Sequence, residues 1–292
     1  MADPLEVMLR KAPRGGGPRK YHFATRPAHL PRERFVIVVH GFNRTEDEAR
    51  ESYVSFHDNL IGVANRVGRD LCAVFWPGDA WTPFVRVFQY PSLIDNAMAC
   101  AAPLAEFIAG CRRRAGGPSE IIVVAHSLGC RLVLEALLSL KNRKPTPQLN
   151  LTVVLMAAAV PTQYLGNTGY LKNSVRVAKR IYVMFSPIDK TLAHLFAPGQ
   201  RLARDPPSGK IEAVGLNGQP LKLWNRPILM DGFDHGDYWI ESRTAEEIAK
   251  LAGAPVPTAL DSRTLVRRLG VLPRRLSRRK LRGVRSLQRR RL

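Results

Sequence analysis

The sequence IIVVAHSLGCRL, residues 121–132, joins two different patterns of apolar residues. Four largely β-branched residues lead into a turn, and apolar residues at helical spacing follow, so the sequence predicts a strand, a tight turn and a helix. Ser127 lies in the turn. In a nucleophile elbow of the pattern Gly-x-Ser-x-Gly, a strained turn exposes the serine hydroxyl and small flanking residues let the strand and helix approach. Gly129 fits this pattern, whereas Ala125 replaces the upstream glycine, so an ordinary strand-to-helix connection is the alternative for this stretch alone.

Strands and helices are predicted to alternate along the chain. Buried parallel strands have continuous apolar runs, and such runs occupy residues 35–39, 71–76, 121–124, 151–156 and 181–185. We therefore predict an α/β fold with a mostly parallel central sheet, helices on both faces and ligands at the carboxyl ends of the strands. Residues 21–25 and 211–216 are candidate edge strands. Residues 157–177, about twenty in number, leave room for a minimal lid only.

The domain boundaries follow from composition. At 292 residues and 45% hydrophobic content, the chain can form one domain, which we assign to residues 21–255. A flexible basic arm rich in glycine and proline, residues 1–20, precedes it, and an Arg-rich, partly amphipathic tail, residues 256–292, follows. Of the net charge of +21, residues 262–292 supply +13 and residues 35–261 only +3. The basic character therefore belongs to the ends.

The sequence indicates a cytoplasmic protein. It contains no uninterrupted run of about 18 apolar residues, and charged residues interrupt its first twenty positions. Its four cysteines include no close CxxC pair, which favours free, buried thiols over disulfides or a zinc site. We expect no metal and no cofactor.

Five sequence features resemble the α/β-hydrolase superfamily, and within it the small esterase- and lipase-like members of unassigned substrate. They are HGFN at 40–43, WPGD at 76–79, AHSLG at 125–129, Asp189 and His235. Each follows a predicted strand or lies near the end of the chain, and the order Ser, Asp, His is that of the superfamily. The resemblance covers about residues 35–250 and implies a serine hydrolase that cleaves a carboxylic ester through an acyl-enzyme.

The chemistry of such an enzyme gives each residue type a role. A serine hydroxyl becomes nucleophilic when an imidazole accepts its proton, and a carboxylate orients that imidazole. Ser127, His235 and Asp189 would take these roles. Two backbone N–H groups stabilise the oxyanion: Leu128 follows the nucleophile, and the resemblance assigns Phe42 as the second donor.

Several assignments have alternatives. Asp189 could instead cap the segment that follows it, in which case Asp79 or Asp231 would be the orienting acid. Substrate-pocket candidates lie in the motifs and in the aromatic loop after residue 79: His40, Asp79, Trp81, Phe84 and His126. The aromatic residues among them are equally typical of a hydrophobic core.

The function and the partners also stay open at this stage. Thioesters and amides are cleaved by the same set of groups, and a catalytically silent hydrolase fold could serve as a binding protein. The tail interleaves leucine and arginine on both sides of Pro273, a pattern suited to the anionic surface of a membrane. Nucleic acid is the weaker alternative because the tail lacks aromatic residues for stacking, and a solvated tail without a partner is the third. The expected location is the cytoplasm, with possible contact at the membrane periphery.

Overall fold

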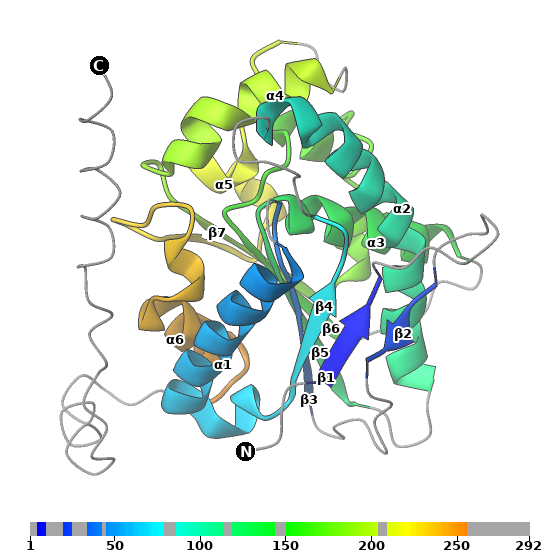
Figure 1. Cartoon of the computed structure of the whole chain (residues 1–292), viewed down its shortest axis with the longest axis vertical. Coiled ribbons are helices and arrows are strands. Elements are labelled where there is room, and N and C mark those ends of the chain that lie inside the picture. Colours follow the sequence, from blue (N-terminus) through cyan, green and yellow to red (C-terminus); the bar gives the residue numbers. More distant parts are fainter. Residues whose placement is uncertain are drawn as a thin grey trace, which may run out of the picture. The chain divides into compact units, whose positions relative to one another are not determined.

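Eight strands form a single sheet in the computed structural model, in the order β2-β1-β4-β3-β5-β6-β7-β8 (Figure 1). All neighbouring strands are parallel except β1 and β2, which are antiparallel. The strands are β1 Leu5–Met8, β2 His22–Phe23, β3 Arg34–Val39, β4 Leu71–Phe75, β5 Glu120–His126, β6 Leu151–Met156, β7 Arg180–Phe185 and β8 Arg226–Leu229. The structure describes residues 5–9, 20–24, 34–42, 45–78, 86–113, 118–143, 150–203 and 209–255.

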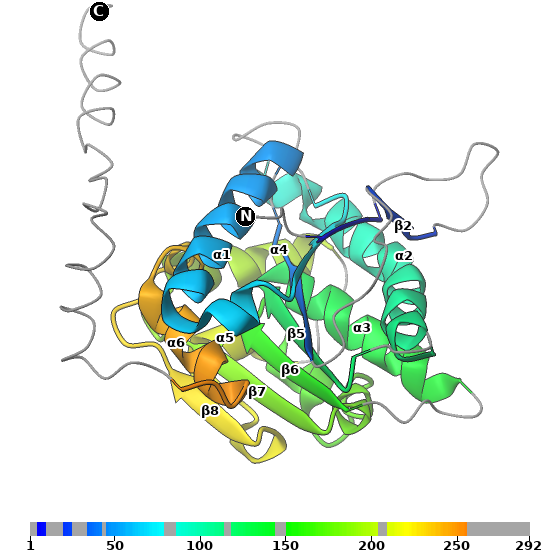
Figure 2. The same ribbon diagram turned by 90° about the horizontal axis from the view of Figure 1, so that it is seen from below.

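Helices lie on both faces of this sheet. Figure 2 shows α1 and α6 on one side and α2 and α3 on the other. The α-helices are α1 Glu46–Gly68, α2 Arg86–Arg113, α3 Leu128–Asn142, α4 Ala197–Leu202, α5 Val214–Asn217 and α6 Ser242–Leu251. Shorter helical turns are η2 Thr162–Leu165, η3 Ser174–Val177, η4 Leu192–Phe196, η5 Leu221–Leu223 and η6 Asp237–Trp239.

Burial explains why the central strands are continuously apolar. Every residue of β4 and β6 is buried, as are all but the first residues of β3 and β5. Parallel strands covered by helices on both faces have no solvent-exposed side, so alternation with polar residues disappears. The predicted α/β fold with a mostly parallel sheet is confirmed.

Helix α2 contains a segment, Tyr90–Cys111, that is long and apolar enough to cross a membrane. In the fold, more than half of that segment is buried, and α2 packs against α3 and α4. Its apolar residues therefore contribute to the core of the domain.

Two predictions at the margins of the sheet were wrong. Residues 211–216 do not form an edge strand; α5 begins at Val214, and the edge is β8, which contains Pro227. The arm assigned to residues 1–20 includes β1, which pairs with β4 and buries Val7 completely. Local apolar alternation at Leu5, Val7 and Leu9 prevails there over the basic composition of the segment. Residues 256–292, which hold the predicted tail, lie outside the described residues.

Tyr53 connects α1 to the carboxyl ends of two central strands. Its hydroxyl donates to the Val74 carbonyl at 2.6 Å and accepts from the His40 backbone N–H at 2.7 Å. The side chain is buried, and burial raises the pKa of Tyr53 well above its ordinary value, which keeps the hydroxyl protonated as a donor. Tyr53 therefore satisfies two buried backbone groups at the base of the loop that begins at His40.

Replacing Tyr53 with phenylalanine should lower the free energy of unfolding by about 2–4 kcal/mol, because two buried backbone groups lose their partner. Urea denaturation measures this change. Tyr182→Phe is the matched control, since the half-buried Tyr182 hydroxyl makes no hydrogen bond with a described residue. Equal stability of the two variants would contradict this role for Tyr53.

Candidate active site

Ser127 occupies a strained turn between β5 and α3. Its φ of 53° and ψ of −124° lie outside the regions that non-glycine residues usually adopt. Three backbone hydrogen bonds hold this conformation. Ser127 N–H donates to the Met156 carbonyl at 3.0 Å, and the Ser127 carbonyl accepts from Cys130 at 3.0 Å and from Ala159 at 3.1 Å. The turn therefore has the geometry of a nucleophile elbow.

The two small residues of the elbow motif meet different constraints. A Cβ atom at Gly129 would lie 2.3 Å from the His40 carbonyl oxygen, so α3 approaches β3 too closely for any side chain. Ala125 is fully buried in β5, where its methyl group is accommodated. Glycine is thus obligatory downstream of the serine, and the upstream departure from the motif has no structural cost.

Ser127, His235 and Asp189 are joined by two hydrogen bonds. Ser127 Oγ lies 2.9 Å from His235 Nε2, and Asp189 Oδ2 lies 2.7 Å from His235 Nδ1. An ionised carboxylate only accepts, so Nδ1 carries a hydrogen, and in the neutral ring Nε2 then accepts from the serine hydroxyl. These three predicted residues are spread over 108 positions of the chain, and the structure brings their side chains together.

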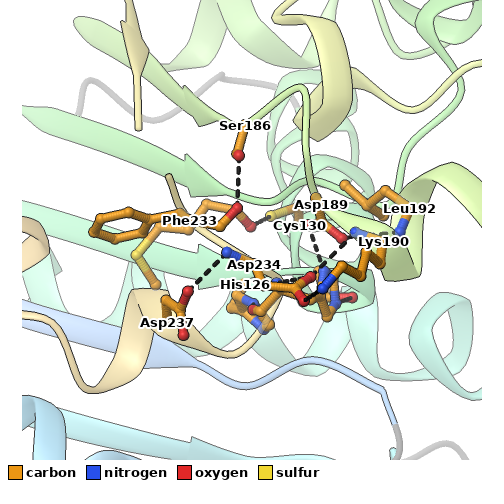
Figure 3. Close-up of polar contacts among 12 residues, drawn as sticks. His126, Cys130, Ser186, Asp189, Lys190, Leu192, Phe233, Asp234 and Asp237 are labelled. Carbon is orange, nitrogen blue, oxygen red and sulfur yellow. Dashed lines mark hydrogen bonds and ion pairs between the residues drawn. The ribbon is translucent and has the colours of Figure 1, made fainter. Parts of the chain in front are cut away.

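Asp189 is fully buried in the turn after β7, and each of its carboxylate oxygens has a partner. Oδ2 faces His235, while Oδ1 accepts from the Leu192 backbone N–H at 2.9 Å (Figure 3). Capping of the following segment, which the sequence offered as an alternative, therefore occurs together with the contact to histidine. The other candidates are not at this position: Asp231 is exposed, and Asp79 lies outside the described residues.

The two residues predicted to donate to the oxyanion, Phe42 and Leu128, lie near Ser127. A Cβ atom at Gly41 would lie 2.7 Å from Ser127 Cβ, so only glycine lets this loop pass so close to the serine. The next residue, Phe42, lines the cavity beside Ser127. Leu128 is the first residue of α3, where backbone N–H groups have no acceptor within the helix.

A cavity of about 390 Å³ opens over Ser127 and His235. Among the described residues, its wall is mostly apolar, and much of it comes from η4 and the start of α4. The lining residues are Phe42, Glu48, Tyr90, His126, Ser127, Ala159, Thr191, Leu192, Leu195, Phe196, Gly199, His235 and Gly236. The segment from Thr191 to Gly199 contains no catalytic motif, so its place in the cavity wall was not predicted from the sequence. Trp81 and Phe84, two predicted pocket residues, lie outside the described part of the chain.

Comparison with protein families identifies the chain independently of this geometry. The model of a family described as alpha/beta hydrolase of unknown function (DUF900) matches residues 20–204, more than half of the sequence. The chain belongs to this family. No curated protein matches the chain.

Solved structures of low sequence identity are similar to this α/β hydrolase. An uncharacterized protein from Bacillus cereus is 14% identical, with a TM-score of 0.43; the match covers 78% of this chain and 61% of that protein. Carboxyl esterase 2 from Tuber melanosporum is 14% identical, with a TM-score of 0.46 and 85% of each chain covered. An esterase from Pyrobaculum calidifontis is 14% identical, with a TM-score of 0.42 and coverage of 81% and 79%.

The two histidines of the hydrolase motifs have different environments. His126 lines the cavity, and its Nε2–H donates to the His235 carbonyl at 2.8 Å. His40, which we also predicted in the pocket, is fully buried and absent from the described lining. Its ring stacks on Trp76 at 5.5 Å and its Nδ1–H donates to the Gly41 carbonyl at 2.8 Å. His40 therefore shapes the loop that carries Phe42.

The described residues contain no group of three or more His, Cys, Asp or Glu side chains placed to hold a metal ion. All four cysteines of this hydrolase are free and buried, as predicted. Cys130, directly behind the elbow, donates to the Ala125 carbonyl at 3.2 Å, and burial raises the pKa of its thiol far above the ordinary value. The thiol therefore stays protonated and unreactive.

Substitution of the elbow glycine tests the close approach of α3 and β3. Gly129→Ala should destabilise the fold by about 1–3 kcal/mol or more, since the new methyl group meets backbone rather than a flexible side chain. The matched control is Gly62→Ala in α1, where a Cβ meets nothing within 4 Å. That change should raise stability by about 0.5–1 kcal/mol through the better helix propensity of alanine. Thermal unfolding of both variants checks the prediction, and a Gly129→Ala protein as stable as wild type would refute it.

Proposed function

We propose that this protein is a serine hydrolase that cleaves carboxylic esters through an acyl-enzyme. The observation that supports the proposal most strongly is the pair of hydrogen bonds from Ser127 to His235, 2.9 Å, and from His235 to Asp189, 2.7 Å. A buried carboxylate, an imidazole and a serine in a strained turn make up the set of groups that acyl transfer requires. All three side chains belong to one described unit of an α/β-hydrolase fold.

In the proposed reaction, Ser127 Oγ attacks the ester carbonyl carbon while His235 Nε2 accepts the hydroxyl proton. Backbone N–H groups of Phe42 and Leu128 stabilise the negative oxygen of the tetrahedral intermediate. The intermediate collapses, the C–O bond to the alcohol breaks, and His235 returns the proton to the leaving alkoxide. Water then attacks the acyl-serine with His235 as the base, which releases the carboxylic acid and restores Ser127.

The cavity favours an uncharged acyl group. Phe42, Tyr90 and Phe196 supply apolar surface beside Ser127, and such surface binds hydrocarbon rather than ionic groups. Glu48 contributes a carboxylate to the same lining, which disfavours an anionic substrate. A parallel assay with an ester, a thioester and an anilide of the same acyl chain separates the esterase from thioesterase and amidase activities.

A fluorophosphonate probe, which forms a covalent adduct with activated serines, should label Ser127 in the wild-type protein. The adduct should disappear in Ser127→Ala and be strongly reduced in His235→Ala. Asp189→Asn should lower kcat by about 10⁴-fold, because the neutral amide stabilises the wrong tautomer of the histidine. Intact-mass spectrometry and hydrolysis of p-nitrophenyl esters provide the two measurements.

His22→Ala is the matched control for His235→Ala, since His22 lies exposed on β2. It should label and turn over substrate like the wild type. A folded wild-type protein that forms no adduct and hydrolyses no ester, thioester or anilide would instead support a catalytically silent binding protein.

We also propose that the tail acts at anionic membrane surfaces. Residues 262–292 contain thirteen Lys or Arg and no Asp or Glu, interleaved with leucine. The full chain should sediment with vesicles containing anionic lipid at low salt, and a chain ending at Asp261 should not. Binding should weaken as salt increases. Equal sedimentation of both chains would contradict the proposal.

A further inference from the structure

Asp234 connects the two loops that carry the proposed acid and base. Its Oδ1 accepts from the Lys190 backbone N–H at 3.1 Å (Figure 3) and from the His235 backbone N–H at 2.9 Å. Lys190 directly follows Asp189, the proposed acid. Asp234 Oδ1 therefore binds both the residue next to Asp189 and His235, the proposed base. The two loops otherwise belong to different parts of the chain, one after β7 and one after β8.

We propose that Asp234 is a positioning residue that fixes the separation of Asp189 and His235. The inference rests on the proposed serine hydrolase function and adds to it a residue without contact to substrate. Asp234 would act through the backbone of the two loops, whereas Asp189 acts through its side chain on the imidazole.

His235 is held on both sides by this arrangement. Its backbone N–H donates to Asp234, and its backbone carbonyl accepts from His126 Nε2–H at 2.8 Å. The main chain of His235 therefore cannot shift in either direction without losing a hydrogen bond. The imidazole can then reach Ser127 and Asp189 with little loss of orientational freedom on binding substrate.

Other contacts fix Asp234 in turn. Its backbone N–H donates to Asp237 Oδ2 at 2.7 Å, and its second carboxylate oxygen lies 3.5 Å from Lys190 Nζ. A residue earlier, the Phe233 carbonyl accepts from the buried Ser186 hydroxyl at 2.6 Å, which adds a second link between the two loops (Figure 3). Asp237 therefore restrains the backbone of Asp234, and the carboxylate lies close to the Lys190 ammonium group.

The carboxylate of Asp234 is ionised in this environment. Partial burial raises its pKa, but hydrogen bonds from the His235 and Lys190 backbone amides and the Lys190 charge outweigh that effect, so the pKa lies below its ordinary value. An ionised oxygen accepts two N–H groups more strongly than a neutral one does. The ion pair with Lys190 adds little, since 78% of the lysine side chain is exposed.

Three substitutions of Asp234 separate the effect of its oxygen positions from the effect of its charge. Asparagine keeps an acceptor oxygen at the same distance from the backbone, glutamate keeps the charge but moves the oxygens by one methylene group, and alanine removes both. If Asp234 positions the loops, Asp234→Asn should stay within about threefold of wild-type kcat. Asp234→Ala and Asp234→Glu should lose about 10–100-fold in kcat with little change in KM, because misplaced catalytic groups slow the chemical step.

The matched control is Asp231→Asn. Asp231 is exposed on the same loop, and its carboxylate makes no hydrogen bond within the described ranges. This variant should have wild-type kcat and the same pH profile of kcat/KM. The acid limb of that profile, which reports ionisation of the base, should shift more in Asp234→Ala than in Asp234→Asn.

The outcomes of this experiment are distinct. Asp234→Glu more active than Asp234→Asn would mean that charge rather than position matters, and would overturn the inference. Wild-type kcat in all three folded variants would overturn it as well. Wild-type protein without any esterase activity or probe labelling would instead refute the proposed function. Melting temperatures identify a variant that fails to fold, and the comparison of Asn with Glu tests the inference without the alanine variant.

Discussion

Two hydrogen bonds to the imidazole ring of His235 require three distant segments of the chain to meet at one edge of the sheet. They join Ser127, Asp189 and His235, which come from the turn after β5, the turn after β7 and the segment after β8. The three segments lie far apart in the sequence, so contacts between sequence neighbours do not bring them together. The parallel sheet does so, because the carboxyl ends of its strands open on one edge. The meeting of Ser127, Asp189 and His235 therefore depends on the order and register of β5 to β8.

Strained backbone conformations occur at the same edge of the sheet, where β5 and β6 end. Among the described non-glycine residues, positive φ values occur at Ser127 and Ala157, which directly follow the adjacent strands β5 and β6. The two turns support each other: Ser127 donates to the last residue of β6, and Ala159 donates to the Ser127 carbonyl. A residue in an unfavourable conformation persists only where its surroundings fix it, and here the neighbouring strand does so.

The sequence predicted the features that depend on local pattern or on a motif. Five apolar runs identified the central strands, and the superfamily motifs singled out Ser127, Asp189 and His235, whose side chains the structure places within hydrogen-bonding distance. Prediction failed where a residue's role depends on distant packing. His40 belongs to a motif, yet Trp76 and Tyr53 bury it, and this contact arises only when β3, β4 and α1 are assembled.

Asp234 illustrates the same limit. Its sequence context, FDHGDY, shows two acids around a histidine and does not show which of them contacts Lys190, 44 residues away. The edge strand β8 was missed for a related reason. An edge strand needs fewer apolar residues than a central one, and β8, with the sequence RPIL, has no continuous apolar run.

The charge near the site differs in sign from that of the whole chain. The net charge of +21 comes mainly from residues 262–292. Near the site, the Asp189 carboxylate contacts the His235 imidazole and the Asp234 carboxylate accepts from the His235 backbone N–H. Glu48 adds a carboxylate to the cavity lining. In the proposed mechanism, these carboxylates stabilise the imidazolium formed during acyl transfer and disfavour anions in the cavity. The high basic charge of the chain is therefore a property of its ends and gives no indication that the substrate is acidic.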